Sequence, residues 1–246
     1  MNFPVFDLHC DTVLNILGRD LQGSGSLRKN EGHIDLERAK TLPGYAQCFA
    51  CFTSPLHKLP AGMSQIQLFE RELAAIQREL YRSRDLIAQA YTAEDVRQNL
   101  ANGMMSAVLT IEGPAGFDYD PALLEDLYKI GFRITTLGWN ERNPLTGSHI
   151  TGGVAGYNQC AEFTGEQPDL DTVCDHILHF LELDPDGLHI ALGGDLDGID
   201  EMPAGFTGVQ DYPKLAQKLL ERGVDAQTVR QIFWDNALGV MDRCCM

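Results

Sequence analysis

The stretch FDLHCDT, residues 6–12, places two acids and a histidine at alternate positions in the first apolar segment of the chain. Successive side chains of a β-strand point to opposite faces, so Asp7, His9 and Asp11 would share one face. An imidazole and a carboxylate two residues apart can reach a single metal ion, and zinc accepts both kinds of ligand. Asp7, deeper in the strand, could orient His9. The stretch predicts a strand that ends in part of a metal site, although His-x-Asp alone is a weak signal.

Two other predicted strands also end in carboxylates. The segment 106–112 (SAVLTIE) ends in Glu112, and the segment 188–194 (LHIALGG) runs directly into Asp195. In a (βα) barrel the carboxyl ends of the strands form the active site. Taken singly, each of these acids is explained as a solvated carboxylate in a loop or as the cap of a helix. Acids at three strand ends, one of them beside His9, favour a shared site.

Short apolar runs alternate with longer helical patterns along the whole chain. The predicted strands are 4–10, 45–52, 106–112, 132–139, 153–160 and 188–194, and the predicted helices are 64–82, 92–102, 120–130, 170–183, 212–222 and 226–242. Such alternation predicts a parallel sheet covered by helices, either a (βα) barrel or an open doubly wound sheet. A Gly-rich phosphate turn does not follow the first strand, which argues against nucleotide binding. No linker or repeat divides the sequence, so residues 1–246 are predicted to form a single domain.

Composition excludes several classes of function. The net charge of −16 repels phosphate backbones, so no nucleic-acid partner is expected. No apolar run approaches the roughly 18 residues of a membrane helix, and the start of the chain lacks the basic region of a signal peptide. Seven cysteines form an odd set without a disulfide pattern, which predicts a cytoplasmic protein. Cys48 and Cys51 lie in a strand-like run, where positions three apart face opposite sides, so a redox pair is not expected.

Seven pieces of the chain occur in the same order in one known family: DLHCDT, GHIDLERAKTLPGYAQCFACF, TIEG, ITTLGWNERNPL, GGVAGYN, HIALGGDLDG and VQDYPKLAQKLLERGV. In these pieces the chain resembles the membrane (renal) dipeptidase family of zinc metallopeptidases, which have an amidohydrolase-type barrel. The resemblance implies a (βα)8-type TIM barrel of the metallo-dependent hydrolase type. By position, it implies that His9 and Asp11 bind the first metal, that Glu112 bridges two metals, and that Asp195 is the acid/base. The implied reaction is hydrolysis of the amide bond of small dipeptides by a metal-activated water.

The chain departs from the family pattern in its middle. Only six strands are recognisable, and about a dozen residues separate Trp139 from Gly153, too few for two βα units. In the family this interval holds strands five and six, each ending in a histidine that binds the second metal, followed by an arginine for the substrate carboxylate. None of these has a match here. We therefore expect an incomplete barrel that holds one zinc ion more readily than two.

Other histidines are weaker candidates for the missing ligands. His149 lies in the shortened junction, where a solvated histidine is the simpler explanation. His176 and His179 are spaced for chelation, but the apolar stripe of their helix places His179 on the outer face. The remaining histidines lie in connecting segments or at the start of a strand: His33, His57 and His189. Trp139, at the end of strand 132–139, is predicted to be either a wall of the substrate pocket or a core aromatic.

Three functions remain open from the sequence. The first is a zinc-dependent dipeptidase, the second is a catalytically inactive metal-binding remnant of that family, and the third is a one-metal amidohydrolase that acts on another small amide. An incomplete barrel also exposes sheet edges and apolar surface that a second copy of the chain would cover. The sequence therefore predicts a homodimer whose interface includes residues 139–155.

Overall fold

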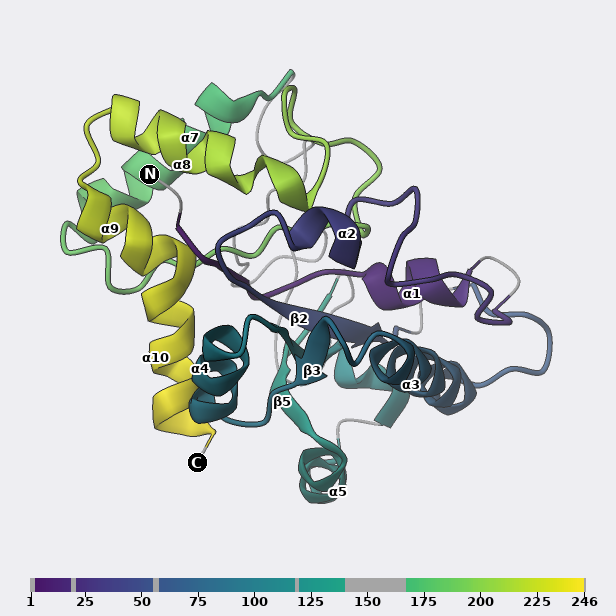
Figure 1. The fold of residues 1–246 in the computed structure, drawn as a ribbon. Helices are drawn as coiled ribbons and strands as arrows, with labels where there is room; N and C mark the ends of the chain where they lie inside the picture. Colours follow the sequence, from purple (N-terminus) through teal and green to yellow (C-terminus); the bar gives the residue numbers. More distant parts are fainter. Residues whose placement is uncertain (1–2, 19–20, 55–57, 118–119, 140–166, 246) are drawn as a thin grey trace.

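A five-stranded, entirely parallel sheet forms the centre of the computed structural model, which describes residues 3–18, 21–54, 58–117, 120–139 and 167–245 (Figure 1). The strands are β1 (Val5–Asp7), β2 (Tyr45–Phe52), β3 (Ile87–Gln89), β4 (Met105–Glu112) and β5 (Phe132–Thr135). Their order is β1-β2-β4-β3, and β5 also pairs with β4. Helices connect the strands, as parallel pairing requires.

The register of β4 places Glu112 at the carboxyl end of the sheet. β2 pairs with β4 from Ala46↔Ser106 to Phe52↔Glu112, so both long strands end at the same level. β3 lies beside the start of β4, and β5 lies beside its end, with Ile111 opposite Thr135. One side of β4 is therefore shared by two short strands.

Five of the described helices, α2, α3, α4, α7 and α9, begin at a residue whose side chain caps them. Ser64 with Gln67 and Thr92 with Asp95 form complete capping boxes at the starts of α3 and α4, which confirms these two predicted starts. The α-helices are α1 (Thr12–Leu17), α2 (Leu36–Ala39), α3 (Gln65–Arg82), α4 (Ala93–Ala101), α5 (Ala122–Ile130), α7 (Leu170–Leu183), α8 (Tyr212–Glu221), α9 (Ala226–Arg230) and α10 (Asn236–Cys244). Short turns of other helix types are η1 (Pro114–Phe117), η2 (Val209–Asp211) and the π-helical η3 (Gln231–Asp235), which joins α9 to α10.

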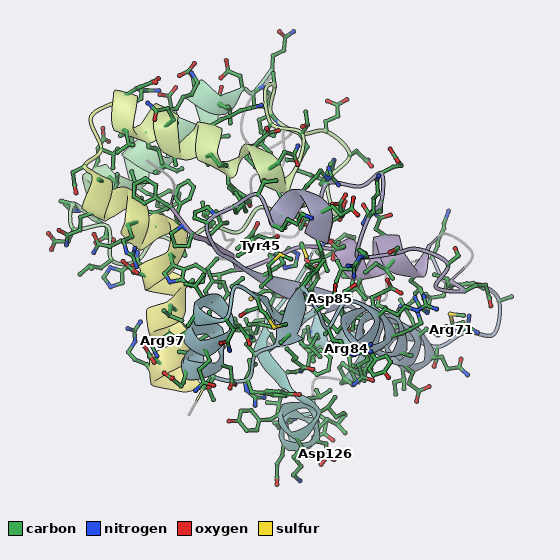
Figure 2. The ribbon with its side chains drawn as sticks, viewed as in Figure 1. Tyr45, Arg71, Arg84, Asp85, Arg97 and Asp126 are labelled. Atoms are coloured by element: carbon green, nitrogen blue, oxygen red, sulfur yellow. The ribbon has the colours of Figure 1, made fainter. Side chains whose placement is uncertain are left out.

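The two faces of the sheet bury different sets of side chains. Phe6, Cys48 and Val108 belong to a core cluster with residues of α4 and α10, and Arg97 of α4 pairs with Asp242 of α10 at its rim (Figure 2). Phe49, Cys51, Leu109 and Ile111 belong to the larger cluster, which also contains residues of α1 and α3. Cys48 and Cys51 therefore face opposite sides of β2, as predicted from the alternation of side chains in a strand.

The predicted strand 188–194 is not a regular strand, and this prediction is wrong in detail. The segment runs parallel to β1 through isolated bridges, with Leu8 N donating to Leu192 O at 2.9 Å. The next main-chain hydrogen bond between the two segments does not form. Gly194 N instead donates to the side chain of Asp7, at 3.0 Å. The segment still places Asp195 beside the end of β1.

Other boundaries differ from those predicted. Strand 4–10 shortens to β1, and strand 132–139 shortens to β5. The sequence did not predict β3, α1 or α2, which are three, six and four residues long. The predicted strand 153–160 lies outside the described residues. The predicted fold class is confirmed as an α/β fold of the barrel type, in which the described strands do not close into a complete barrel.

Among the helices that the structure describes, none combines the length and apolar character needed to cross a membrane.

Candidate metal site

The three strand ends that the sequence singled out converge in space. His9, Asp11 and Asp195 each offer a ligand atom within 4.8 Å of the others. His9 Nε2 lies 3.5 Å from Glu112 Oε2 and 3.4 Å from Asp195 Oδ1. These distances are long for hydrogen bonds, but two atoms that are each about 2.1 Å from a tetrahedral zinc ion lie about 3.4 Å apart. The residues present thus fit a zinc ion by both spacing and ligand type.

Asp11 carries a buried oxygen without a donor. Its Oδ1 has no hydrogen-bond partner among the described residues. Burial raises the pKa of the Asp11 carboxyl well above its usual range, and the charge of Glu112 raises it further. A buried carboxylate is unfavourable unless a cation or hydrogen-bond donors compensate its charge. A bound cation would remove this penalty.

His9 lies between two of the acids. Burial would lower the pKa of its imidazole, but the carboxylates of Asp195 and Glu112 outweigh burial and hold that pKa well above its ordinary value. The acids therefore favour a positive charge at the place where a metal ion would sit.

A tight turn fixes Glu112 at the end of β4. Gly113 adopts a left-handed conformation with φ +69°, and a Cβ at this position would lie 2.5 Å from Thr53 O. Thr53 N in turn donates to Glu112 O at 2.9 Å. Only glycine fits this close approach between two chain segments, so the pair Glu112-Gly113 is one structural unit.

Asp195 lies in a second strained turn. Asp195 and Asp197 are non-glycine residues with φ of +53° and +70°, a conformation that costs about 1–2 kcal/mol per residue. A Cβ on Gly198 would lie 2.3 Å from Asp11 Oδ2 and 2.4 Å from Asp195 Oδ1. The turn therefore brings these two carboxylates together, and glycine at position 198 leaves them room.

Asp7 supports the site through the backbone, whereas the sequence suggested that it might orient His9 directly. Its Oδ1 accepts from His9 N and Gly194 N, both at 3.0 Å, and its Oδ2 accepts from the hydroxyl of Tyr212. The buried carboxylate thus ties β1 to the segment before Asp195 and to the start of α8. None of these three bonds involves the imidazole ring of His9.

Trp139 lies near the end of the sheet. Its ring packs edge-on against Phe52 at 4.9 Å between centroids, and Phe52 is the register partner of Glu112. This places the indole beside the strand end that carries the site. A role in substrate binding remains a prediction.

Six histidines remain besides His9. His176 lies on α7 and is partly buried. His179 and His189 are exposed and pair with Glu182 and Asp184, so both are surface residues, as the helix pattern predicted for His179. His57 and His149 lie outside the described residues. His33 lies in a connecting segment, as the sequence predicted, but this segment reaches the turn after Asp195, where Asp197 N donates to His33 Nδ1 at 3.0 Å.

Glu72 is a buried carboxylate that the sequence did not single out. It lies on α3 and is fully buried, and neither oxygen makes a well-formed hydrogen bond to any described residue. Burial raises the pKa of Glu72 well above its usual range, and the charge of Asp11 raises it further, while the Phe52 amide opposes the rise. The sequence could have indicated this burial, because position 72 lies on the face of α3 that carries its buried apolar residues.

We expect Glu72→Gln to stabilise the metal-free protein at high pH. The folded pKa of Glu72 lies above the unfolded value of 4.5, so its contribution to stability is complete below pH 4.5 and is lost as pH rises through the folded pKa. Thermal unfolding of the chelator-treated protein at pH 8 should show a rise in Tm of about 2–4 °C for each ~1 kcal/mol gained, and little change at pH 4.5.

Glu79, two turns further along α3, is the matched control. It accepts from Leu27 N and Arg82 Nη1, both at 3.0 Å, and these partners lower its pKa despite its burial. Glu79→Gln should therefore lower Tm at neutral pH. A lower Tm for Glu72→Gln at pH 8 would contradict the expectation.

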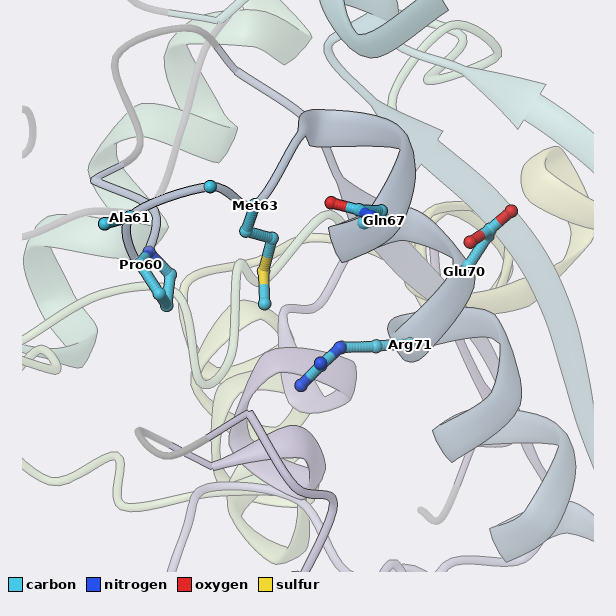
Figure 3. A pocket seen from close by; sticks show the side chains of 7 residues that line it. Pro60, Ala61, Met63, Gln67, Glu70 and Arg71 are labelled. Atoms are coloured by element: carbon cyan, nitrogen blue, oxygen red, sulfur yellow. The ribbon is translucent and has the colours of Figure 1, made fainter.

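A separate surface pocket of about 430 Å³ lies at the start of α3 (Figure 3). Seven residues line it: Pro60, Ala61, Gly62, Met63, Gln67, Glu70 and Arg71. Arg71 reaches into it and also donates to Leu21 O at 3.0 Å. None of the four predicted site residues lines this pocket.

The sequence matches the model of one known protein family over most of its length. The family model of membrane dipeptidases, peptidase family M19, matches residues 1–152 and 145–244 of the chain. The chain belongs to the M19 family. The two matched stretches meet within the junction at which the sequence lacks two βα units, and the resemblance inferred from the sequence is confirmed.

Curated relatives match only part of the chain. A protein of Schizosaccharomyces pombe named an uncharacterized dipeptidase is 40% identical over 93 residues, which are 37% of this chain and 23% of that protein. A dipeptidase of Clonostachys rogersoniana is 36% identical over 78 residues, which are 31% of this chain and 20% of that protein. The matches therefore span less than a quarter of either relative.

Solved structures share the fold. An M19 metallopeptidase named dipeptidase AC has a TM-score of 0.78 at 19% identity, over 100% of this chain and 99% of that one. A metallopeptidase of Rhodobacter sphaeroides, solved with a phosphinate mimic of the dipeptide L-Ala-D-Ala, also has a TM-score of 0.78 at 19% identity, over 99% of this chain and 100% of that one. At such identities the likeness shows the fold alone.

Proposed function

We propose that the chain is a zinc-dependent dipeptidase that hydrolyses the amide bond of small dipeptides. The observation that carries the proposal is the position of His9 Nε2, 3.4–3.5 Å from carboxylate oxygens of Asp195 and Glu112, with Asp11 in the same cluster. Family membership and the dipeptidase names of the relatives support this choice of reaction.

Each residue of the cluster has a role in the proposal. His9, Asp11 and Glu112 would hold the zinc ion, which when bound polarises the substrate carbonyl and lowers the pKa of water. Asp195 would accept a proton from the attacking water at Oδ1 and pass it to the nitrogen of the leaving amine as the carbon–nitrogen bond breaks. Trp139 would border the substrate beside Phe52.

We expect one tightly held zinc ion per chain. Without the two family histidines, a second cation would have only Glu112 and water as ligands, which is too few for the four-coordinate preference of zinc. Metal analysis after dialysis, together with an assay of dipeptide hydrolysis, tests both the metal and the reaction. Two retained zinc equivalents per chain would reveal a further metal ligand, for which His149 is the first candidate. Bound zinc without dipeptide hydrolysis would contradict the proposed dipeptidase activity.

Two other functions share the same cluster. A catalytically inactive remnant of the family would bind zinc through His9, Asp11 and Glu112 without turnover, and the missing histidine pair favours it. A one-metal amidohydrolase would use all four residues on another small amide. Hydrolysis of non-peptide amides in the absence of dipeptide hydrolysis would identify the latter.

We expect the chain to form a homodimer. Among the described strands, β5 pairs only with β4, and the adjoining helix α5 exposes Leu124, Tyr128 and Ile130 by 40–50%, with Leu137 beyond the strand exposed by 55%. A second copy with two-fold symmetry would cover this apolar edge. Of residues 139–155, which the sequence predicts to belong to the interface, all but Trp139 lie outside the described residues. Light scattering at micromolar concentration should give twice the 27.2 kDa mass of one chain, and a monomer mass would refute the dimer.

The proposed location is the cytoplasm. Six cysteines in the described ranges are free thiols, and five of them are buried. Unpaired thiols are typical of a reducing compartment.

A further inference from the structure

His33 and Asp197 are in contact although 164 residues separate them in the sequence. Asp197 N donates to His33 Nδ1 at 3.0 Å, and His33 N donates to Asp197 Oδ1 at 2.5 Å. Thr12 Oγ1 donates to the second carboxylate oxygen of Asp197 at 2.7 Å. Both oxygens and the amide of Asp197 are therefore held by other segments of the chain.

The opposite side of the same turn is bonded to the residues that follow β1. Asp195 N donates to His9 O at 3.2 Å, and Asp11 N donates to Leu196 O at 3.0 Å. Between these contacts and the His33 contacts, Asp195 and Asp197 keep left-handed backbone conformations that non-glycine residues disfavour. If the hydrogen bonds on one side of the turn are lost, the backbone of Asp195 and Asp197 can relax toward the negative φ values that non-glycine residues ordinarily adopt.

We propose that His33 is a positioning residue, whose Nδ1 holds the Asp197 amide and thereby keeps Asp195 against His9. The inference rests on the proposed function, because Asp195 is the proton carrier in that reaction. The carboxylate of Asp197 cannot replace Asp195 in this arrangement, since Thr12 and His33 already bind both of its oxygens.

The ring of His33 can be changed with little effect on its own segment. His33 O accepts from Val209 N at 3.0 Å, and this main-chain bond does not depend on the side chain. His33→Ala removes the acceptor for the Asp197 amide. His33→Asn restores an acceptor, because an asparagine Oδ1 can occupy the place of Nδ1.

The test compares the zinc-loaded 246-residue wild type, His33→Ala and His33→Asn, with His189→Ala as a control. His189 is 84% exposed and also pairs with an aspartate, so its removal should change nothing. In His33→Ala we expect kcat for a dipeptide to fall by about 10–100-fold with little change in KM, and His33→Asn should recover most of the loss.

Crystal structures of the two variants provide a readout that does not need activity. The distance from Asp195 Oδ1 to His9 Nε2, 3.4 Å in the wild type, should be retained in His33→Asn and should lengthen in His33→Ala. An unchanged distance in His33→Ala, or failure of His33→Asn to restore it, would overturn the inference. If wild type hydrolyses no dipeptide, the proposed function fails, and this distance alone still decides the role of His33.

Discussion

Asp195→Asn is expected to abolish dipeptide hydrolysis while the fold is kept. The amide keeps the size of the carboxylate but cannot accept and return a proton, a role worth about 10²–10⁴ in rate. The strained turn should persist, because its contacts through Leu196, Asp197 and His33 do not use the Asp195 side chain. Steady-state kinetics with metal analysis on the same preparation measures both effects.

Asp200→Asn is the matched control for this variant. Asp200 is exposed and lies five residues further along the same segment, so the Asp200→Asn variant should have the same turnover as wild type. Loss of zinc together with turnover in Asp195→Asn would assign Asp195 to metal binding, which its place in the cluster with His9 and Asp11 also allows. Unchanged turnover with unchanged metal would end the catalytic role of Asp195.

Asp7→Ala is expected to cause a large loss of stability. The buried carboxylate accepts three hydrogen bonds, from Tyr212, His9 N and Gly194 N, and each buried donor left unpaired costs about 1–3 kcal/mol. A total of about 3–5 kcal/mol would lower Tm by roughly 10 °C in a chain of this size. Calorimetry of the metal-free protein measures the change without interference from zinc binding.

Two milder variants separate the parts of this network. Asp7→Asn keeps an acceptor for the two backbone amides, and Tyr212→Phe removes only the hydroxyl, so each should cost about 1–2 kcal/mol. If Asp7→Ala lost no more than these variants, the carboxylate would not be the tie between β1, the segment before Asp195 and α8. Zinc affinity should fall in parallel with stability, because Asp7 fixes the backbone of His9.

The family and the main site could be read from the sequence because both depend on local patterns. His9 and Asp11 share a strand end, and Glu112 and Asp195 follow other strands. Parallel strands place their carboxyl ends at one edge, so convergence of the four residues follows once parallel pairing is assumed. Long elements such as β2, β4 and α3 were predicted within one or two residues, because their apolar periods extend over many positions.

Short elements could not be predicted in the same way. The three residues of β3 and the six of α1 are too few to show a period, and helices of this length depend on tertiary packing for their stability. The segment 188–194 has the composition of a strand, but its ladder is interrupted because the Asp7 carboxylate takes the Gly194 amide. No local pattern encodes that competition.

By itself, then, the sequence determined the M19 family, the α/β architecture and the four residues that converge at the ends of the strands. The tertiary structure alone decided how that site is supported, with Asp7 bonded to Tyr212, Glu72 buried near Asp11, and His33 holding Asp197 from the far end of the chain. The physical reason is the separation along the sequence of the residues that interact. Periodicity and capping act between near neighbours, whereas burial and hydrogen bonding of these side chains depend on segments that meet only when the sheet and its helices have packed.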